Sequence, residues 1–64
     1  MEVIVGNVIS KNSGFRYAIK WDKENETAWI EKQNAWIMVC RNVKTENDAI
    51  KCAQREVDFQ EYLY

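Results

Sequence analysis

The chain has 64 residues, of which 47% are hydrophobic, and its net charge is −1. This apolar content excludes a chain disordered by composition, and no apolar run is long enough for a transmembrane helix. The near-neutral charge gives no general attraction to nucleic acid or to an anionic membrane. A chain this short builds one small core, which supplies about 3–5 kcal/mol of stability, so we expect association with a partner.

Ligands for a metal are scarce, because histidine is absent and there are two cysteines, Cys40 and Cys52. This set cannot form a zinc-type cluster, so we expect no metal and no other cofactor. The N-terminal apolar run, residues 3–5, is too short for a signal peptide. We therefore expect a cytoplasmic protein, not bound to a membrane, with reduced thiols.

The predicted elements begin with four strands separated by three polar loops. The first loop, residues 11–14, ends in glycine, and the segments 22–26 and 31–35 share an acidic residue, Lys, a longer polar residue and Asn. Asn is the non-glycine residue that best tolerates φ > 0, which a three-residue hairpin loop requires at its last position. The sequence predicts strands over about 2–10, 15–21, 26–31 and 35–42.

The segment 27–37 contains Ala-Trp-Ile twice, seven residues apart, and this spacing also fits one side of a helix. Trp, Ile, Val and Thr dominate the segment, however, and these residues favour strands. The flanking loops contain the residues expected in tight turns, and this favours a hairpin over a helix. An antiparallel pairing through Asn34 is thus the hypothesis on which the assignment of faces depends.

A helix is predicted over about 46–61. Thr45 is a suitable N-cap, with Glu46 and Asp48 in the first turn. One apolar stripe at helical spacing comprises Ala49, Ile50, Ala53 and Val57. The predicted fold is a single α+β domain over residues 1–64, a four-stranded antiparallel meander followed by one C-terminal helix packed on one face.

Pairing the strands through three-residue second and third loops assigns every side chain to a face. Trp21 is expected opposite Thr27, and Trp29 opposite Ile37. Gly6 is expected to leave room for the helix over the core face, which comprises Ile4, Val8, Phe15, Tyr17, Ile19, Trp21, Trp29, Ile37 and Val39. The predicted outer face comprises Val3, Val5, Ile9, Arg16, Ala18, Lys20, Ala28, Ile30, Lys32, Trp36, Met38 and Cys40. On this assignment Cys40 and Cys52 are too far apart to bond.

The outer face is the first candidate binding surface, because one short helix cannot cover both faces and exposed apolar patches mark interaction sites. Its candidate binding residues are Arg16, Lys20, Ile30, Lys32, Trp36 and Met38. The second candidate is the apolar surplus of the helix, Cys52, Phe59 and Leu63, which would serve as a binding site or a dimer seam.

No catalytic arrangement stands out. Without histidine, acid–base catalysis would need another side chain with a shifted pKa, and the carboxylates are predicted in turns and on the helix exterior. A glycine-rich phosphate loop is also missing. We expect no enzyme activity but a small protein-binding module, a homodimeric regulator or inhibitor of a larger protein, such as phage or mobile-element genomes encode.

The alternative is single-stranded nucleic-acid binding. Bases stack on aromatic rings while cations contact phosphates, and three predicted outer-face cations, Arg16, Lys20 and Lys32, surround Trp36. The predicted topology resembles the PUR-repeat and whirly-type single-strand-binding architecture, whose units dimerise. The helix carries five carboxylates, so we favour a protein partner over nucleic acid.

Overall fold

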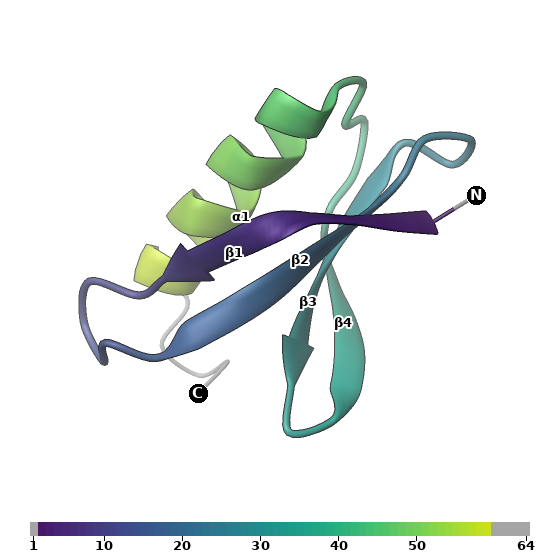
Figure 1. The fold of residues 1–64 in the computed structure, drawn as a ribbon. Helices are drawn as coiled ribbons and strands as arrows, with labels where there is room; N and C mark the ends of the chain where they lie inside the picture. The colour runs from purple at the N-terminus through teal and green to yellow at the C-terminus, as the bar shows by residue number, and fades with distance from the viewer. Residues whose placement is uncertain (1, 60–64) are drawn as a thin grey trace.

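The computed structural model describes residues 2–59 and confirms the predicted fold class. One antiparallel sheet has the strand order β1-β2-β3-β4, and a single helix packs against one of its faces (Figure 1). The elements are β1 (Glu2–Ile9), β2 (Arg16–Asp22), β3 (Thr27–Lys32), β4 (Ala35–Cys40) and α1 (Glu46–Phe59). Each strand boundary is within two residues of the prediction, and predicted helical residues 60–61 lie outside the described residues. Within the described residues there is no helix that is long and apolar enough to cross a membrane.

The core lies between α1 and the sheet. Ala49, Ala53 and Val57 of α1 are buried at successive turns, as their spacing predicts. Their partners on the sheet are Val8, Tyr17, Ile19, Trp21, Ala28, Ile30 and Cys40. A Cβ at Gly6 would lie 3.9 Å from Ile50 Cδ1, which is ordinary contact, so glycine is required there by its φ of 152° rather than by space.

The β1–β2 hairpin has the predicted loop over 11–14, with Val8 opposite Tyr17. A bulge after Ile4 then shifts the register, so that Ile4 pairs with Lys20 and Val3 with Trp21. The bulge reverses the faces predicted for the first half of β1. Ile4, predicted in the core, is 68% exposed on the outer face, whereas Val3 lies on the helix side and Val5 packs against the core. Phe15, also predicted in the core, is exposed.

The β2–β3 loop has four residues, Lys23 to Glu26, instead of the predicted three. The Asp22 carboxylate accepts hydrogen bonds from the backbone N–H groups of Glu24 (3.1 Å) and Asn25 (3.3 Å), and from the Asn25 side chain (2.7 Å). Asn25 was predicted to adopt a positive φ, but it instead donates hydrogen bonds to Asp22. The positive φ of this loop, 55°, belongs to Glu26. Trp21 consequently lies opposite Ala28, not Thr27.

The β3–β4 loop has two residues, Gln33 and Asn34, with φ of 52° and 65°. Two successive positive φ angles define a type I′ turn, one residue shorter than predicted. The loop before β3 is one residue longer than predicted and the loop after it is one residue shorter. The faces of β3 are therefore exchanged relative to the prediction, whereas Trp36, Ile37 and Met38 of β4 keep their predicted faces. Trp29 therefore lies on the outer face opposite Met38, while Ala28 and Ile30, predicted on the outer face, are fully buried under α1.

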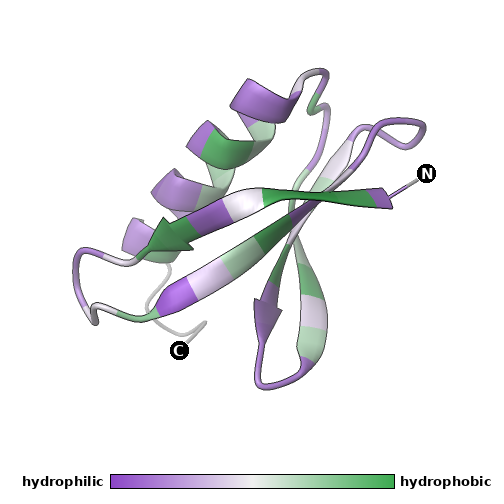
Figure 2. Ribbon diagram, viewed as in Figure 1, coloured by the Kyte–Doolittle hydropathy of each residue, from purple (hydrophilic) through white to green (hydrophobic). Residues whose placement is uncertain are grey.

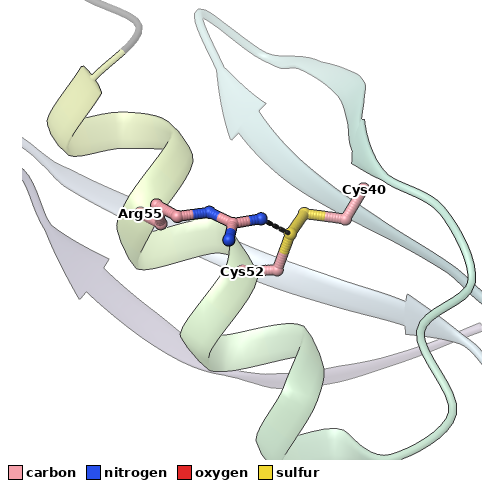
Figure 3. Close-up of a disulfide and its surroundings, with 3 residues drawn as sticks. All are labelled: Cys40, Cys52 and Arg55. Carbon is pink, nitrogen blue, oxygen red and sulfur yellow. Dashed lines mark hydrogen bonds between the residues drawn. A yellow bond between two sulfur atoms is a disulfide. The ribbon is translucent and has the colours of Figure 1, made fainter.

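A disulfide joins Cys40, at the end of β4, to Cys52 of α1, with Cα atoms 6.5 Å apart (Figure 3). The prediction that these cysteines are too distant to bond was wrong. The register shifts between Ala28 and Trp29, which leaves Val39 as the extra residue of β4 and places Cys40 opposite buried Ala28 on the core side. The Arg55 guanidinium donates to Cys52 Sγ at 3.7 Å.

Both ends of α1 are capped by side chains. Thr45 Oγ1 accepts the Asp48 N–H at 3.0 Å, which is the predicted N-cap. At the other end, Ser10 Oγ donates to the Val57 carbonyl (3.4 Å) and the Asn12 side chain donates to the Asp58 carbonyl. The β1–β2 loop thereby fixes the last turn of α1.

Candidate binding surface

The outer face carries a row of side chains that crosses all four strands. Ile4 of β1 pairs with Lys20 of β2, Lys20 with Trp29 of β3, and Trp29 with Met38 of β4. Trp36 lies two pairs further along the hairpin, on the same face and opposite Glu31. We refer to Ile4, Lys20, Trp29, Trp36 and Met38 as the outer-face patch.

Lys20 is the centre of the patch. Its Nζ lies 5.1 Å from the centroid of the Trp29 ring, 4.6 Å from that of the Trp36 ring, and 3.0 Å from Glu2 Oε1. The Lys20 side chain is only 14% exposed, so its cation–π contacts belong to the partly desolvated class, worth between about 0.5 and 2 kcal/mol. Trp29 is further held by a hydrogen bond from its Nε1 to Thr27 Oγ1 at 3.0 Å.

The arrangement produces two half-buried tryptophans that share contacts with the Lys20 ammonium. Met38 lies beside them and is also half-buried. Rigid aromatic side chains supply most of the free energy at protein interfaces, and methionine adapts to irregular surfaces. The patch can therefore bind an apolar surface at a low cost in side-chain entropy.

The strands contribute more carboxylates than cations to the outer face. Strand alternation places two cations, Arg16 and Lys20, and three carboxylates, Glu2, Asp22 and Glu31, on this face. The Lys20 ammonium already contacts one of these carboxylates and both indole rings. The face consequently lacks the excess of positive charge that the nucleic-acid hypothesis assumed.

Four of the six predicted outer-face binding residues lie on the outer face, namely Arg16, Lys20, Trp36 and Met38. Ile30 was wrongly assigned, because it is 0% exposed in the core. Lys32, two residues further along β3, alternates to the same side as Ile30 and lines a cavity of about 350 Å³ at the end of the sheet. Sequence reasoning missed Trp29 and Ile4. A two-residue turn at Gln33 and Asn34 would have placed Trp29 on the same face as Trp36, diagonally across the hairpin.

The predicted helix surface is described for two of its three residues, Cys52 and Phe59. Cys52 is bonded to Cys40 and packs against the core, so it is not a free apolar contact. Phe59 is 71% exposed, and Lys11 Nζ lies 5.3 Å from its ring centroid. Leu63 lies outside the described residues.

Within residues 2–59, two carboxyl groups have shifted pKa values, and both accept hydrogen bonds from loops: Asp22 ends β2 and Asp58 lies in the last turn of α1. Hydrogen bonding, first from the Asn25 side chain, lowers the pKa of Asp22. The Lys11 backbone N–H, followed by the Gln54 side chain, lowers the pKa of Asp58. Neither shift produces an acid or base matched to neutral pH. Across residues 2–59 no three potential ligand side chains converge to hold a metal ion.

Comparison with known proteins gives no relative. No protein family model, curated protein or solved structure matches the chain. The outer-face patch and the disulfide are therefore the features from which a function is inferred.

Proposed function

We propose that the protein is a small, non-catalytic protein-binding module, a homodimer that regulates or inhibits a larger protein through its outer-face patch. The observation that carries this proposal is the pair of tryptophans held by Lys20 at 4.6 and 5.1 Å on a face that no element among residues 2–59 covers. Large apolar side chains on an uncovered sheet face mark interaction sites.

A protein partner fits this face better than nucleic acid does. Phosphate binding needs uncommitted cations, whereas Lys20 contacts Glu2 and two rings, and Glu31 adds a second carboxylate. Stacking with bases would also require Lys20 to leave the indole rings. Single-stranded nucleic-acid binding is thus kept as the competing outcome of the test below.

The expected cytoplasmic location stays a prediction, and the disulfide weighs against it, because reducing compartments keep protein thiols free. Thiol titration of the freshly isolated, denatured protein tests it. Two free thiols per chain would fit the cytoplasm, whereas none would fit an oxidising compartment.

The function is tested by identifying a partner with photo-crosslinking groups placed at Gln33, beside the patch, and at Lys51, on the helix side. The partner should crosslink from the first position, and Trp36→Ala should weaken its binding at least tenfold. Phe59→Ala, which removes an aromatic ring from the exposed surface outside the patch, is the control and should leave binding unchanged. Equal binding by both variants would refute the proposed surface. A labelled single-stranded oligonucleotide that binds with a steep salt dependence would support the nucleic-acid alternative instead.

A further inference from the structure

The disulfide joins two sulfur atoms in unlike surroundings. Cys40 is 4% exposed and lies on the core side of β4. Cys52 is half-buried, beside the buried Ala53 at the margin of the apolar stripe of α1. Figure 2 shows the polar colour on the side of α1 that is turned away from the sheet. A small reagent in the solvent therefore reaches Cys52 Sγ more easily than Cys40 Sγ.

Arg55 gives the Cys52 sulfur a positive neighbour, because its guanidinium donates to Sγ at 3.7 Å (Figure 3). The thiolate is the reactive form of cysteine, and an adjacent positive charge stabilises it. Asp48 and Glu56 lie four residues before and after Cys52 on α1, and their charges oppose a thiolate. Residues four apart on a helix have Cβ atoms about 5–6 Å from each other. The guanidinium is in contact with the sulfur, so its charge dominates there.

We propose that Cys52 is an oxidation site for small hydroperoxides and that Cys40 is the thiol that converts the product into the disulfide. In the first step, the Cys52 thiolate attacks one oxygen of the peroxide. An S–O bond forms, and the O–O bond breaks with its electron pair leaving as hydroxide. The sulfur loses two electrons and becomes a sulfenic acid.

In the second step, the Cys40 thiol attacks the oxidised Cys52 sulfur. An S–S bond forms, the S–O bond breaks, and the hydroxyl group leaves with the Cys40 proton as water. Two thiols and one hydrogen peroxide thus yield one disulfide and two molecules of water. No other oxidant or reductant is needed.

A hydroperoxide fits this site better than a bulky disulfide reagent. Cys52 packs against the core and presents only part of its surface, which favours a small oxidant. The bond that breaks in the first step releases a negatively charged oxygen. A guanidinium beside the sulfur stabilises such a charge as it develops, and Arg55 is already in that position.

Contacts other than the disulfide hold the two cysteines close to each other. Cys40 pairs with Ala28 in the sheet, and α1 is capped by Thr45 and Ser10. The Cα atoms of the two cysteines are 6.5 Å apart, within the range that a disulfide spans. The second step is therefore intramolecular and fast, and it protects Cys52 from further oxidation.

The reactivity of the two thiols can be compared in the wild-type chain. The reduced protein is treated with a limiting amount of iodoacetamide, and trypsin then separates the cysteines by cleavage after Arg41 and Lys51. Cys52 should be alkylated about tenfold faster than Cys40, because Cys40 reacts only after local opening of the fold. Equal rates, which an unfolded reduced chain would also give, or faster reaction at Cys40 would overturn the proposal.

Trapping of the sulfenic acid tests the oxidation itself. Without the second thiol, Cys40→Ser should accumulate sulfenic acid at Cys52 when hydrogen peroxide is added together with dimedone, which labels this group. Cys52→Ser is the matched control, and its Cys40 should be labelled about tenfold more slowly. Circular dichroism checks that both variants remain folded; if either does not, the wild-type alkylation decides. Equal labelling, or none at Cys52, would leave a structural disulfide only.

The role of Arg55 is tested by the rate at which peroxide closes the disulfide in the reduced chain. Arg55→Gln should slow closure by about two- to fivefold, the range expected when one exposed charge interaction is lost. Lys51→Gln removes the same charge from an exposed residue of α1 that is adjacent to Cys52 but does not face it, and should leave the rate unchanged. An equal change in both variants would indicate an effect of net charge and overturn the assignment of Arg55.

Discussion

The two faces of the sheet are both rich in apolar side chains, yet they hold them in different ways. On the helix side, Ile19 and Ile30 are completely buried beneath α1. On the outer side, Trp29 and Trp36 are half-buried and are held by contacts with Lys20. Adjacent residues of one strand therefore differ in role: Ile30 belongs to the core, whereas Trp29 belongs to the surface that we propose for binding. The following substitutions test this division, from the largest expected effect to the smallest.

Ile30→Ala should have the largest effect. Truncating a buried isoleucine costs about 2–5 kcal/mol, which is comparable with the whole stability of a domain this small. Trp29→Ala, one residue away, removes a larger side chain but from the outer face, and should cost much less. Urea denaturation of both variants measures the difference. If Trp29→Ala is the more damaging of the two, the assignment of faces is wrong.

Removing the disulfide should rank second. A crosslink that closes a loop of this length stabilises by about 3 kcal/mol, because it restricts the unfolded chain. The double variant Cys40→Ala/Cys52→Ala should lower the melting temperature, and so should reduction of the wild type. Reduction should leave the melting temperature of the double variant unchanged. A melting temperature insensitive to reduction in the wild type would show that the crosslink contributes nothing.

Lys20→Met should have a smaller effect on stability, about 1 kcal/mol or less, since it removes an ion pair with a half-exposed carboxylate and two cation–π contacts. Its main effect should be on order in the outer-face patch. Tryptophan fluorescence anisotropy decay should show faster motion of Trp29 and Trp36. Lys23→Met, in the exposed β2–β3 loop, is the matched control.

The smallest effect concerns pH. Because hydrogen bonds lower the pKa of Asp58 in the folded protein, the unfolded chain binds the proton more readily. The resulting stability is present above the unfolded value of 3.8 and is lost as the pH falls through the lower folded pKa. Asp58→Asn should therefore flatten the loss of stability between about pH 5 and pH 2. Asp22→Asn should act in the same direction and in the same range, because hydrogen bonds, first from the Asn25 side chain, also lower the pKa of Asp22.

The sequence was sufficient for the order and type of the elements, because alternation, loop residues and the Thr45 cap all have local causes. It was insufficient for the faces of β3. The β2–β3 and β3–β4 loops were predicted with three residues each, whereas they have four and two. The total is the same, so both assignments place Trp36 and Met38 of β4 on the outer face. Ala-Trp-Ile presents a large apolar side chain to either face, so composition could not correct the error.

The bulges explain the remaining errors. A bulge displaces one residue without changing the composition of the strand, and its effect appears only in the pairing. The bulge in β1 moved Ile4 to the outer face, and that in β4 moved Cys40 towards Cys52. Neither the disulfide nor the complete outer-face patch could be assigned without them.

The crosslink between β4 and α1 also limits how far the chain can be extended by force. The backbone from Cys40 to Cys52 spans twelve residue steps, whereas the two Cα atoms are 6.5 Å apart. A molecule pulled from its ends should therefore extend roughly 35 Å less when oxidised than when reduced. The extended length measured under force would therefore show whether the disulfide is oxidised or reduced.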